Sequence, residues 1–465
     1  MTGLRSWILG VTIASCSGGP SAPKLAASPS RVEASAPSVQ APTAQPAAPP
    51  TAPREARLIE HMLRQVEVAR GIKAQSPVPG AFLSRAELIA RVKDHVSREL
   101  PPEAIRNEGL SLQLFGFVPT KFDYEAAEYQ LLEDQLAGYY EPFDKTMYMA
   151  RDLDDQEANA TLAHELVHAL QDQRWDLEAR SKYKPGEGDL SAAVSALAEG
   201  DATSAMFDVM ILRAAPSSGK TAADLPDEAF VAQIREGVNR GAAAGVPHVM
   251  RTSLAAPYIY GTLFVNALRR AGGWEAVDEA WQNSPTTTEQ IIHPAKWKAR
   301  EPAMTVAVPS FVTLGLGWSV ADEDSEGELG ARIAFEEWLT PDAAAAVSEG
   351  WGGDRSVLVT DGPRAAFAWR LRYDPGSTSG DRAAHAYTAL ASALDRNLGA
   401  AAVKTPTFVC RERTDRGPIA MARSASDLIF TLGPARTSES GWTSAATCSQ
   451  ARRWTQEIAA ARTAR

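Results

Sequence analysis

Residues 160–172 read Ala-Thr-Leu-Ala-His-Glu-Leu-Val-His-Ala-Leu-Gln-Asp and constrain this chain more than any other segment. They contain His164, Glu165 and His168 in the order His-Glu-x-x-His. Residues four apart lie almost above one another on a helix of 3.6 residues per turn, so both imidazoles can reach one metal ion. Glu165 lies beside that face, where it can touch a metal-bound water. The pattern therefore predicts a zinc site on a helix.

The apolar residues of the same segment favour a buried helix. Leu162, Leu166 and Leu170 mark a stripe at helical spacing, as expected for a helix packed against a core. The alternative is a pair of exposed histidines on an ordinary helix.

A catalytic zinc ion typically has three protein ligands and one open position. We expect Glu199 to be the third ligand, because small and apolar residues surround it and a carboxylate in such surroundings needs a partner. Asp201 is the nearest alternative, and Asp172 and Glu141 are weaker ones. The two histidines and Glu199 would bind one zinc ion per chain.

The expected chemistry follows from this ligand set. Zinc lowers the pKa of a bound water to about 7, and Glu165 can accept its proton as the hydroxide attacks a carbonyl. The oxyanion then needs a donor, and Tyr260, Tyr258 and His293 are the downstream candidates. Core packing is the alternative for either tyrosine, and a cap or loop position is the alternative for His293.

Just before the metal helix, residues 136–150 form two β-prone runs around a Pro-Phe-Asp-Lys turn, which predicts a hairpin. A strand in this position could pair with an extended peptide substrate, or it could be a purely structural edge.

The N-terminus predicts export. A basic residue, Arg5, precedes an apolar stretch from Trp7 to Ala14 that is too short to span a bilayer. The run Ile-Ala-Ser-Cys ending at Cys16 resembles the lipobox of bacterial lipoproteins, with Ile13 where Leu is usual. An ordinary cleaved signal with a stray cysteine is the alternative. Residues 17–54 are mostly Ser, Ala, Pro, Gly, Thr and Gln, and we expect a disordered tether there.

The net charge and the cysteines limit the binding partners and the cellular compartment that can be expected. The net charge of −10, without a marked basic cluster, argues against nucleic acid and against a polybasic membrane surface. In an exported protein the remaining pair, Cys410 and Cys448, indicates a disulfide, with two buried thiols as the alternative. We therefore expect a protein attached to a bacterial membrane through a lipid on Cys16, facing the periplasm or the cell surface.

The expected fold class is α+β. After the signal peptide (1–16) and tether (17–54), we expect a mainly helical catalytic domain with a small β-sheet edge at residues 55–305. A small α+β domain would follow at residues 306–465, since helical patterns there alternate with short β-prone runs. Residues 189–214 are expected to form a long helix broken locally at Gly200.

The motif and the downstream Glu199 resemble the gluzincin class of zinc metallopeptidases, which includes thermolysin and the zinc aminopeptidases. The resemblance implies a zincin-like fold, with His164, His168 and Glu199 as ligands and Glu165 as general base. It also implies that a later Tyr260 or His293 stabilises the oxyanion. The chain is also similar to a set of bacterial exported proteins that share Gly-Tyr-Tyr-Glu-Pro (138–142), Glu-Gly-Asp-Ala (199–202) and Thr-Glu-Gln-x-x-His-Pro (288–294) runs.

The interval to Glu199 is longer than in thermolysin, so the substrate class does not transfer. The function expected first is zinc-dependent hydrolysis of peptide bonds in a peptide or protein substrate. A non-catalytic zinc-binding lipoprotein and a zinc hydrolase of another amide or an ester are the alternatives. The intact Glu165 favours an enzyme, because a structural zinc site has no use for a base.

Overall fold

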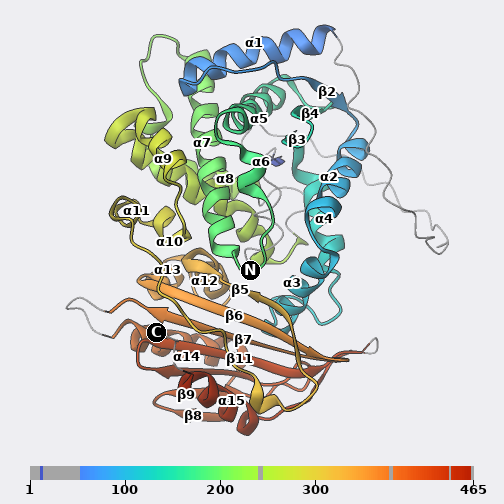
Figure 1. Cartoon of the computed structure of the whole chain (residues 1–465), viewed down its shortest axis with the longest axis vertical. Coiled ribbons are helices and arrows are strands. Elements are labelled where there is room, and N and C mark those ends of the chain that lie inside the picture. The colour runs from blue at the N-terminus through green and yellow to red at the C-terminus, as the bar shows by residue number, and fades with distance from the viewer. Residues whose placement is uncertain (1–10, 14–52, 239–244, 376–380, 439–440, 462–465) are drawn as a thin grey trace, which may run out of the picture.

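The computed structural model describes residues 11–13, 53–238, 245–375, 381–438 and 441–461. Figure 1 shows two parts: mainly helices in blue to yellow, and a large sheet with its helices in orange to red. The α+β class predicted from the sequence, with a helical first part and a C-terminal sheet, is confirmed. The boundary expected near residue 305 lies between the last helix of the first part and the first strand of the second.

The helical part contains eleven α-helices among the described residues. They are α1 (Pro53–Arg70), α2 (Arg85–Glu99), α3 (Pro102–Phe115), α4 (Tyr124–Gln135), α5 (Asp155–Trp175), α6 (Leu177–Ser181), α7 (Gly188–Ala214), α8 (Asp227–Val238), α9 (His248–Gln282), α10 (Thr288–Ile292) and α11 (Pro294–Ala299). α5 has buried side chains at every position from Ala160 to Asp172, so it is the central helix of this part.

A small sheet lies beside α5. Its strands are β1 (Val11–Ile13), β2 (Gly80–Leu83), β3 (Leu136–Glu141) and β4 (Thr146–Ala150), in the order β1-β3-β4-β2. β3 and β4 form the expected antiparallel hairpin, with Tyr139 opposite Tyr148, and β2 pairs parallel to β4. β1 pairs antiparallel with the other side of β3, so a distant segment of the same chain occupies that edge.

Helices α7 and α9 cross at a point where only glycine fits. A Cβ on Gly200 would lie 2.1 Å from the carbonyl of Gly261, and one on Gly261 would lie 1.9 Å from the carbonyl oxygen of Ala196. α7 runs without a break through Gly200, so the local break expected there is wrong. The glycine serves the close approach of α9 instead.

The sheet part is antiparallel throughout. Its path is β5-β6-β7-β11-β10-β9-β8, and β12 pairs with β11. The strands are β5 (Ser319–Asp324), β6 (Trp351–Asp361), β7 (Arg364–Tyr373), β8 (Val403–Thr405), β9 (Phe408–Arg411), β10 (Ile419–Ser424), β11 (Asp427–Arg436) and β12 (Thr443–Ser444).

Each face of this sheet has its own apolar core, as strand alternation requires. Phe367 and Trp369 of β7 pack with α12 (Gly327–Glu336), α13 (Pro341–Ser348) and α14 (Arg382–Leu398), whereas Ala366 and Ala368 pack with α15 (Cys448–Ala460). A disulfide between Cys410 and Cys448 joins β9 to the start of α15.

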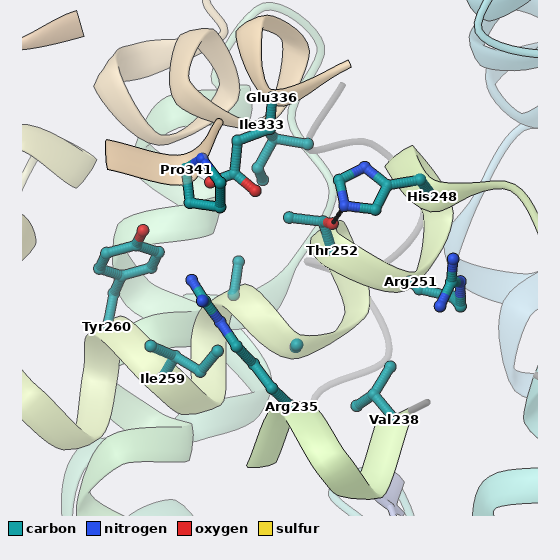
Figure 2. Close-up of a pocket in the computed structure, with 12 residues that line it drawn as sticks. Arg235, Val238, His248, Arg251, Thr252, Ile259, Tyr260, Ile333, Glu336 and Pro341 are labelled. Atoms are coloured by element: carbon teal, nitrogen blue, oxygen red, sulfur yellow. Dashed lines mark hydrogen bonds between the residues drawn. The ribbon is translucent and has the colours of Figure 1, made fainter. Parts of the chain in front are cut away.

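The two parts share contacts. Phe115 at the end of α3 packs against Trp338 and Phe367 of the sheet part. A cavity of about 130 Å³ lies where α8 and α9 meet α12 and α13 (Figure 2). Its polar lining includes Arg235, His248 and Glu336, with Tyr260 at one side.

Most of the predicted signal peptide and tether lies outside the described residues. The exceptions are Val11–Ile13, which forms strand β1, and the last two residues of the expected tether, 53 and 54, which belong to the start of α1. Within the part of the chain that is described, no helix combines the length and apolar character needed to cross a membrane.

Candidate metal centre

Helix α5 presents the motif histidines toward α7. Its N-terminus is fixed by Asp154, whose carboxylate accepts hydrogen bonds from the backbone N–H groups of Gln156 and Glu157. His164 and His168 follow about three and four turns later and are fully buried. Their four-residue separation places both rings on one face, as the sequence predicts.

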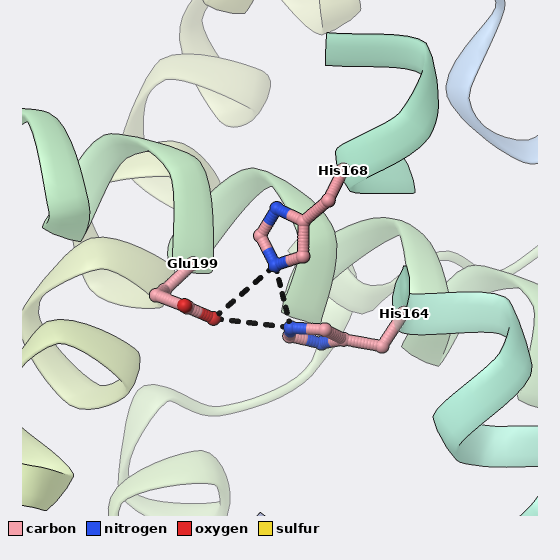
Figure 3. Close-up of side chains that lie close together, drawn as sticks. All are labelled: His164, His168 and Glu199. Atoms are coloured by element: carbon pink, nitrogen blue, oxygen red, sulfur yellow. Dashed lines mark hydrogen bonds and ion pairs between the residues drawn. The ribbon is translucent and has the colours of Figure 1, made fainter. Parts of the chain in front are cut away.

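Three ligand atoms converge between α5 and α7 (Figure 3). His164 Nε2 lies 3.0 Å from an Oε2 of Glu199, and His168 Nε2 lies 3.6 Å from the same oxygen. The two Nε2 atoms are 3.1 Å apart. The structure thus brings together the two histidines and the glutamate that the sequence put forward as ligands.

The spacing of these atoms fits a zinc ion. Ligands at about 2.0–2.1 Å in tetrahedral geometry are about 3.3 Å from one another, and the observed separations of 3.0, 3.1 and 3.6 Å bracket that value. Two His nitrogens and one carboxylate are also the donor set of a catalytic zinc that keeps a fourth position open.

Electrostatics favour a cation at this point. The pKa of Glu199 is lowered to about 2, because the two imidazoles outweigh the effect of burial, which alone would raise it. Burial would lower the pKa of His168, but the Glu199 carboxylate raises it to about 9. Burial lowers the pKa of His164. The buried carboxylate is therefore ionised, and a cation must offset its charge: a protonated His168 when the site is empty, or a metal ion in its place.

Asp201, the nearest alternative ligand, belongs to another network. One of its oxygens accepts a hydrogen bond from Arg70 Nε at 2.5 Å, and the other accepts one from Trp281 Nε1 at 2.8 Å. Arg70 is itself buried and lies over the ring of Trp274. Asp201 thus ties α1 and α9 to α7 and is not part of the cluster of ligand atoms.

The two weaker alternatives are also engaged elsewhere. Glu141 pairs with His95 and Arg98 of α2. Asp172 accepts a hydrogen bond from the hydroxyl of Tyr140 at 2.8 Å.

Glu165 faces the small sheet. Its Oε2 accepts a hydrogen bond of 2.7 Å from the backbone N–H of Tyr140 in β3, and the side chain is fully buried. This bond holds the carboxylate between α5 and β3.

The three expected oxyanion donors occupy different places. The ring of Tyr258 lies 6.0 Å from that of His164, centroid to centroid. Tyr260 and His293 belong instead to one chain of contacts through α12. His293 Nε2 lies 3.0 Å from a Glu328 oxygen, and Arg332 bridges Glu328 to the hydroxyl of Tyr260. The hydrogen bond to Glu328 raises the pKa of His293.

Sequence reasoning missed three residues in these networks. Glu328 and Arg332 come from the sheet part, so no local pattern connects them to His293. Gln171 lies one turn after His168 on α5, and its amide contacts both His168 and the backbone of α7. The signal for Gln171 was present, since residues three apart share a helix face.

A second group of carboxylates is already neutralised. Glu289, Glu301 and Asp374 lie close enough together to hold a metal ion. The ammonium group of Lys296 lies between them, at 2.6, 2.7 and 2.6 Å. This group is a salt-bridge cluster that joins the two parts of the molecule.

Fold and site together define a class: an α+β protein in which a His-Glu-x-x-His helix and the helix after next bring two imidazoles and a carboxylate together. Comparison with family models matches a domain of unknown function, DUF8575, to residues 316–441. That span lies in the sheet part and excludes His164, His168 and Glu199.

No curated protein matches the chain. Among solved structures, the chain is similar to one described as a "putative hydrolase with a novel fold" from Chloroflexus aurantiacus. The identity is 18%, the match covers 53% of this chain and 88% of that one, and the TM-score is 0.33. No function follows from similarity at that level.

Proposed function

We propose that this chain is a zinc-dependent peptidase with His164, His168 and Glu199 as zinc ligands and Glu165 as general base. The observation that carries the proposal is the convergence of the three ligand atoms within 3.6 Å, next to a buried Glu165. A structural zinc site usually has four protein ligands and needs no base. In the described residues this cluster contains three ligands.

The chain's own residues divide the chemistry between them. When bound, zinc supplies a water of lowered pKa and polarises the scissile carbonyl. Glu165, held by the N–H of Tyr140, takes up the proton of the attacking water and delivers it to the leaving amine. The oxyanion needs a donor. Tyr258, Tyr260 and His293 are the candidates from the sequence, and the position of Tyr258 beside His164 makes it the first residue to test.

An extended peptide is the proposed substrate. β3 lies beside the metal helix, and its Tyr140 N–H already holds the general base. Val11–Ile13 of the same chain pairs antiparallel with β3, with Thr12 opposite Gly138. Such pairing supports a strand edge that accepts an extended segment through main-chain hydrogen bonds.

We further propose that the protein is exported and anchored by a lipid on Cys16. Cys16 and residues 17–52 lie outside the described residues, so the proposal rests on the lipobox-like run and the tether composition. Cys16→Ser should release the protein from membranes. A wild type already found in the soluble fraction would overturn this part.

The test of the peptidase is cleavage of a peptide library by the full chain, followed by mass spectrometry. We expect cleavage that a chelator abolishes and added zinc restores. Glu165→Gln should keep the zinc and lose cleavage, because it removes the base and leaves the three ligands. A zinc-loaded wild type that cleaves no peptide, or a Glu165→Gln variant that cleaves as well as the wild type, would refute the proposal.

A further inference from the structure

Gln171 is the residue through which helix α5 contacts helix α7 next to the metal ligands. It is fully buried, and its amide makes two hydrogen bonds in different directions. Its Oε1 lies 2.8 Å from His168 Nδ1, and its Nε2 donates to the carbonyl oxygen of Ala198 at 3.0 Å. Ala198 immediately precedes Glu199, so one side chain touches one ligand and the backbone next to another.

The carbonyl of Ala198 decides how the amide is oriented. A carbonyl oxygen only accepts hydrogen bonds, so the NH₂ group of Gln171 must face it. The amide oxygen then faces His168, and Nδ1 of that ring must donate a proton to it. Nε2 is consequently the nitrogen turned toward His164 and Glu199. The neutral amide therefore fixes which ring nitrogen of His168 can bind a cation.

The two histidines are not held equally. His164 Nδ1 is buried and has no hydrogen-bond partner within the described chain, whereas His168 Nδ1 has Gln171. The outer hydrogen bond of a metal-binding histidine orients the ring and increases its basicity, and loss of it typically costs about 10–100-fold in metal affinity. Among the described contacts, Gln171 provides that outer bond for one ligand of the pair.

We infer that Gln171 is a positioning residue of the metal centre, which orients the ring of His168 so that its Nε2 faces His164 and Glu199. The inference rests on the proposed zinc site but not on peptide cleavage. It assigns Gln171 a role in metal affinity that is separate from the base, Glu165, and from the ligands themselves.

The experiment measures zinc dissociation constants by competition with a chromophoric chelator, using the full chain. Gln171→Met keeps nearly the same shape and loses both hydrogen bonds, so we expect zinc to bind about 10–100-fold more weakly. Gln171→Glu gives Nδ1–H a charged acceptor, which increases the basicity of the ring, and should bind zinc more tightly than the wild type, although it loses the donor to Ala198. Gln173→Met is the matched control, because Gln173 contacts the loop at Ser76 and leaves the ligands alone.

A merely structural role would lower the thermal stability of both Gln171 variants alike and leave the zinc affinity of the folded protein unchanged. An unchanged affinity in Gln171→Met overturns the inference. So does a Gln171→Glu variant that binds zinc as weakly as Gln171→Met. If Gln171→Met does not fold, the comparison of Gln171→Glu with Gln173→Met decides: tighter zinc binding in Gln171→Glu supports the inference, and equal or weaker binding overturns it.

The outcomes separate this inference from the proposed function. A wild type that binds zinc, depends on Gln171 and cleaves no peptide refutes the peptidase and leaves the role of Gln171 standing. If the wild type cleaves peptides in the presence of zinc and Gln171→Met binds zinc as tightly as the wild type, only the role of Gln171 is refuted. A wild type that binds no zinc refutes both.

Discussion

Substituting Gly200 by alanine tests whether the crossing of α7 and α9 sets the position of the third ligand. A Cβ at this position would lie 2.1 Å from the carbonyl carbon and oxygen of Gly261, and ordinary contact begins at 3.4 Å. The two backbones must therefore separate by about 1.3 Å, the difference between these distances. Metal–ligand distances tolerate only about 0.2 Å. If α7 moves by only about one sixth of this separation, about 0.2 Å, Glu199 is displaced by the whole of that tolerance.

We expect Gly200→Ala to lower the stability by about 1–3 kcal/mol, the usual cost of overpacking. Alanine favours a helix by about 1 kcal/mol over glycine, so helix propensity alone would make the variant more stable. A loss of stability therefore comes from the steric clash with Gly261. Thermal unfolding and zinc competition measure the two effects. Gly245→Ala is the control, because a Cβ there meets no atom within 4 Å. A Gly200→Ala variant with wild-type unfolding temperature and zinc affinity would refute the reasoning.

Three further perturbations change charged groups in the helical part, one of them in the candidate metal centre. Burial raises the pKa of Asp189 from 3.8 to about 8, although Thr288 donates hydrogen bonds to its carboxylate. The folded protein therefore binds this proton more tightly than the unfolded chain does. As a result, the folded state loses stability as the pH rises from about 4 to 8. Asp189→Asn should make that fall shallower in pH-dependent denaturant unfolding, and an unchanged slope would contradict the assignment. Lys296→Met leaves three carboxylates without their cation. Because this cluster is only partly buried, the loss should cost about 1–3 kcal/mol at pH 8 and less at pH 5, measured the same way. Glu199→Ala should remove most of the bound zinc as measured by atomic absorption, whereas Asp201→Asn should retain it, and the reverse result would move the third ligand.

The site could be predicted from sequence where the chemistry is local. His164 and His168 are four residues apart on one helix, so helical geometry alone pairs them. Glu199 lies on another helix, and it could be chosen only because its neighbours are apolar. The argument applied almost equally to Asp201. What separates the two is Arg70, which lies 131 residues from Asp201 in the chain and neutralises it.

The fold class could be predicted from the hydrophobic periodicity of the sequence, but the details of several helices and strands could not. Pro101 and Pro102 follow the end of α2, and Pro102 also begins α3, since proline fits the first turn of a helix. β5, with the sequence Ser-Val-Ala-Asp-Glu-Asp, lacks the alternation of a half-buried strand, and its pairing with β6 defines it. Gly200 was expected to break α7, whereas the contact with α9 requires glycine there.

The contacts of Tyr260 and His293 show where sequence reasoning stops. Both were chosen as residue types able to donate to an oxyanion. Their partners, Glu328 and Arg332, belong to α12 in the sheet part, and only the packing of the two parts connects them. The closeness of Tyr258 to His164 is likewise a tertiary contact between α9 and α5.

The most direct test of the zinc centre is a crystal structure of the zinc-loaded protein with anomalous diffraction recorded at the zinc absorption edge. We predict one strong anomalous peak per chain, at about 2.0–2.2 Å from His164 Nε2, His168 Nε2 and a carboxylate oxygen of Glu199. A zinc-loaded crystal with no peak between these three side chains, or with its peak at other residues, would contradict the proposed centre.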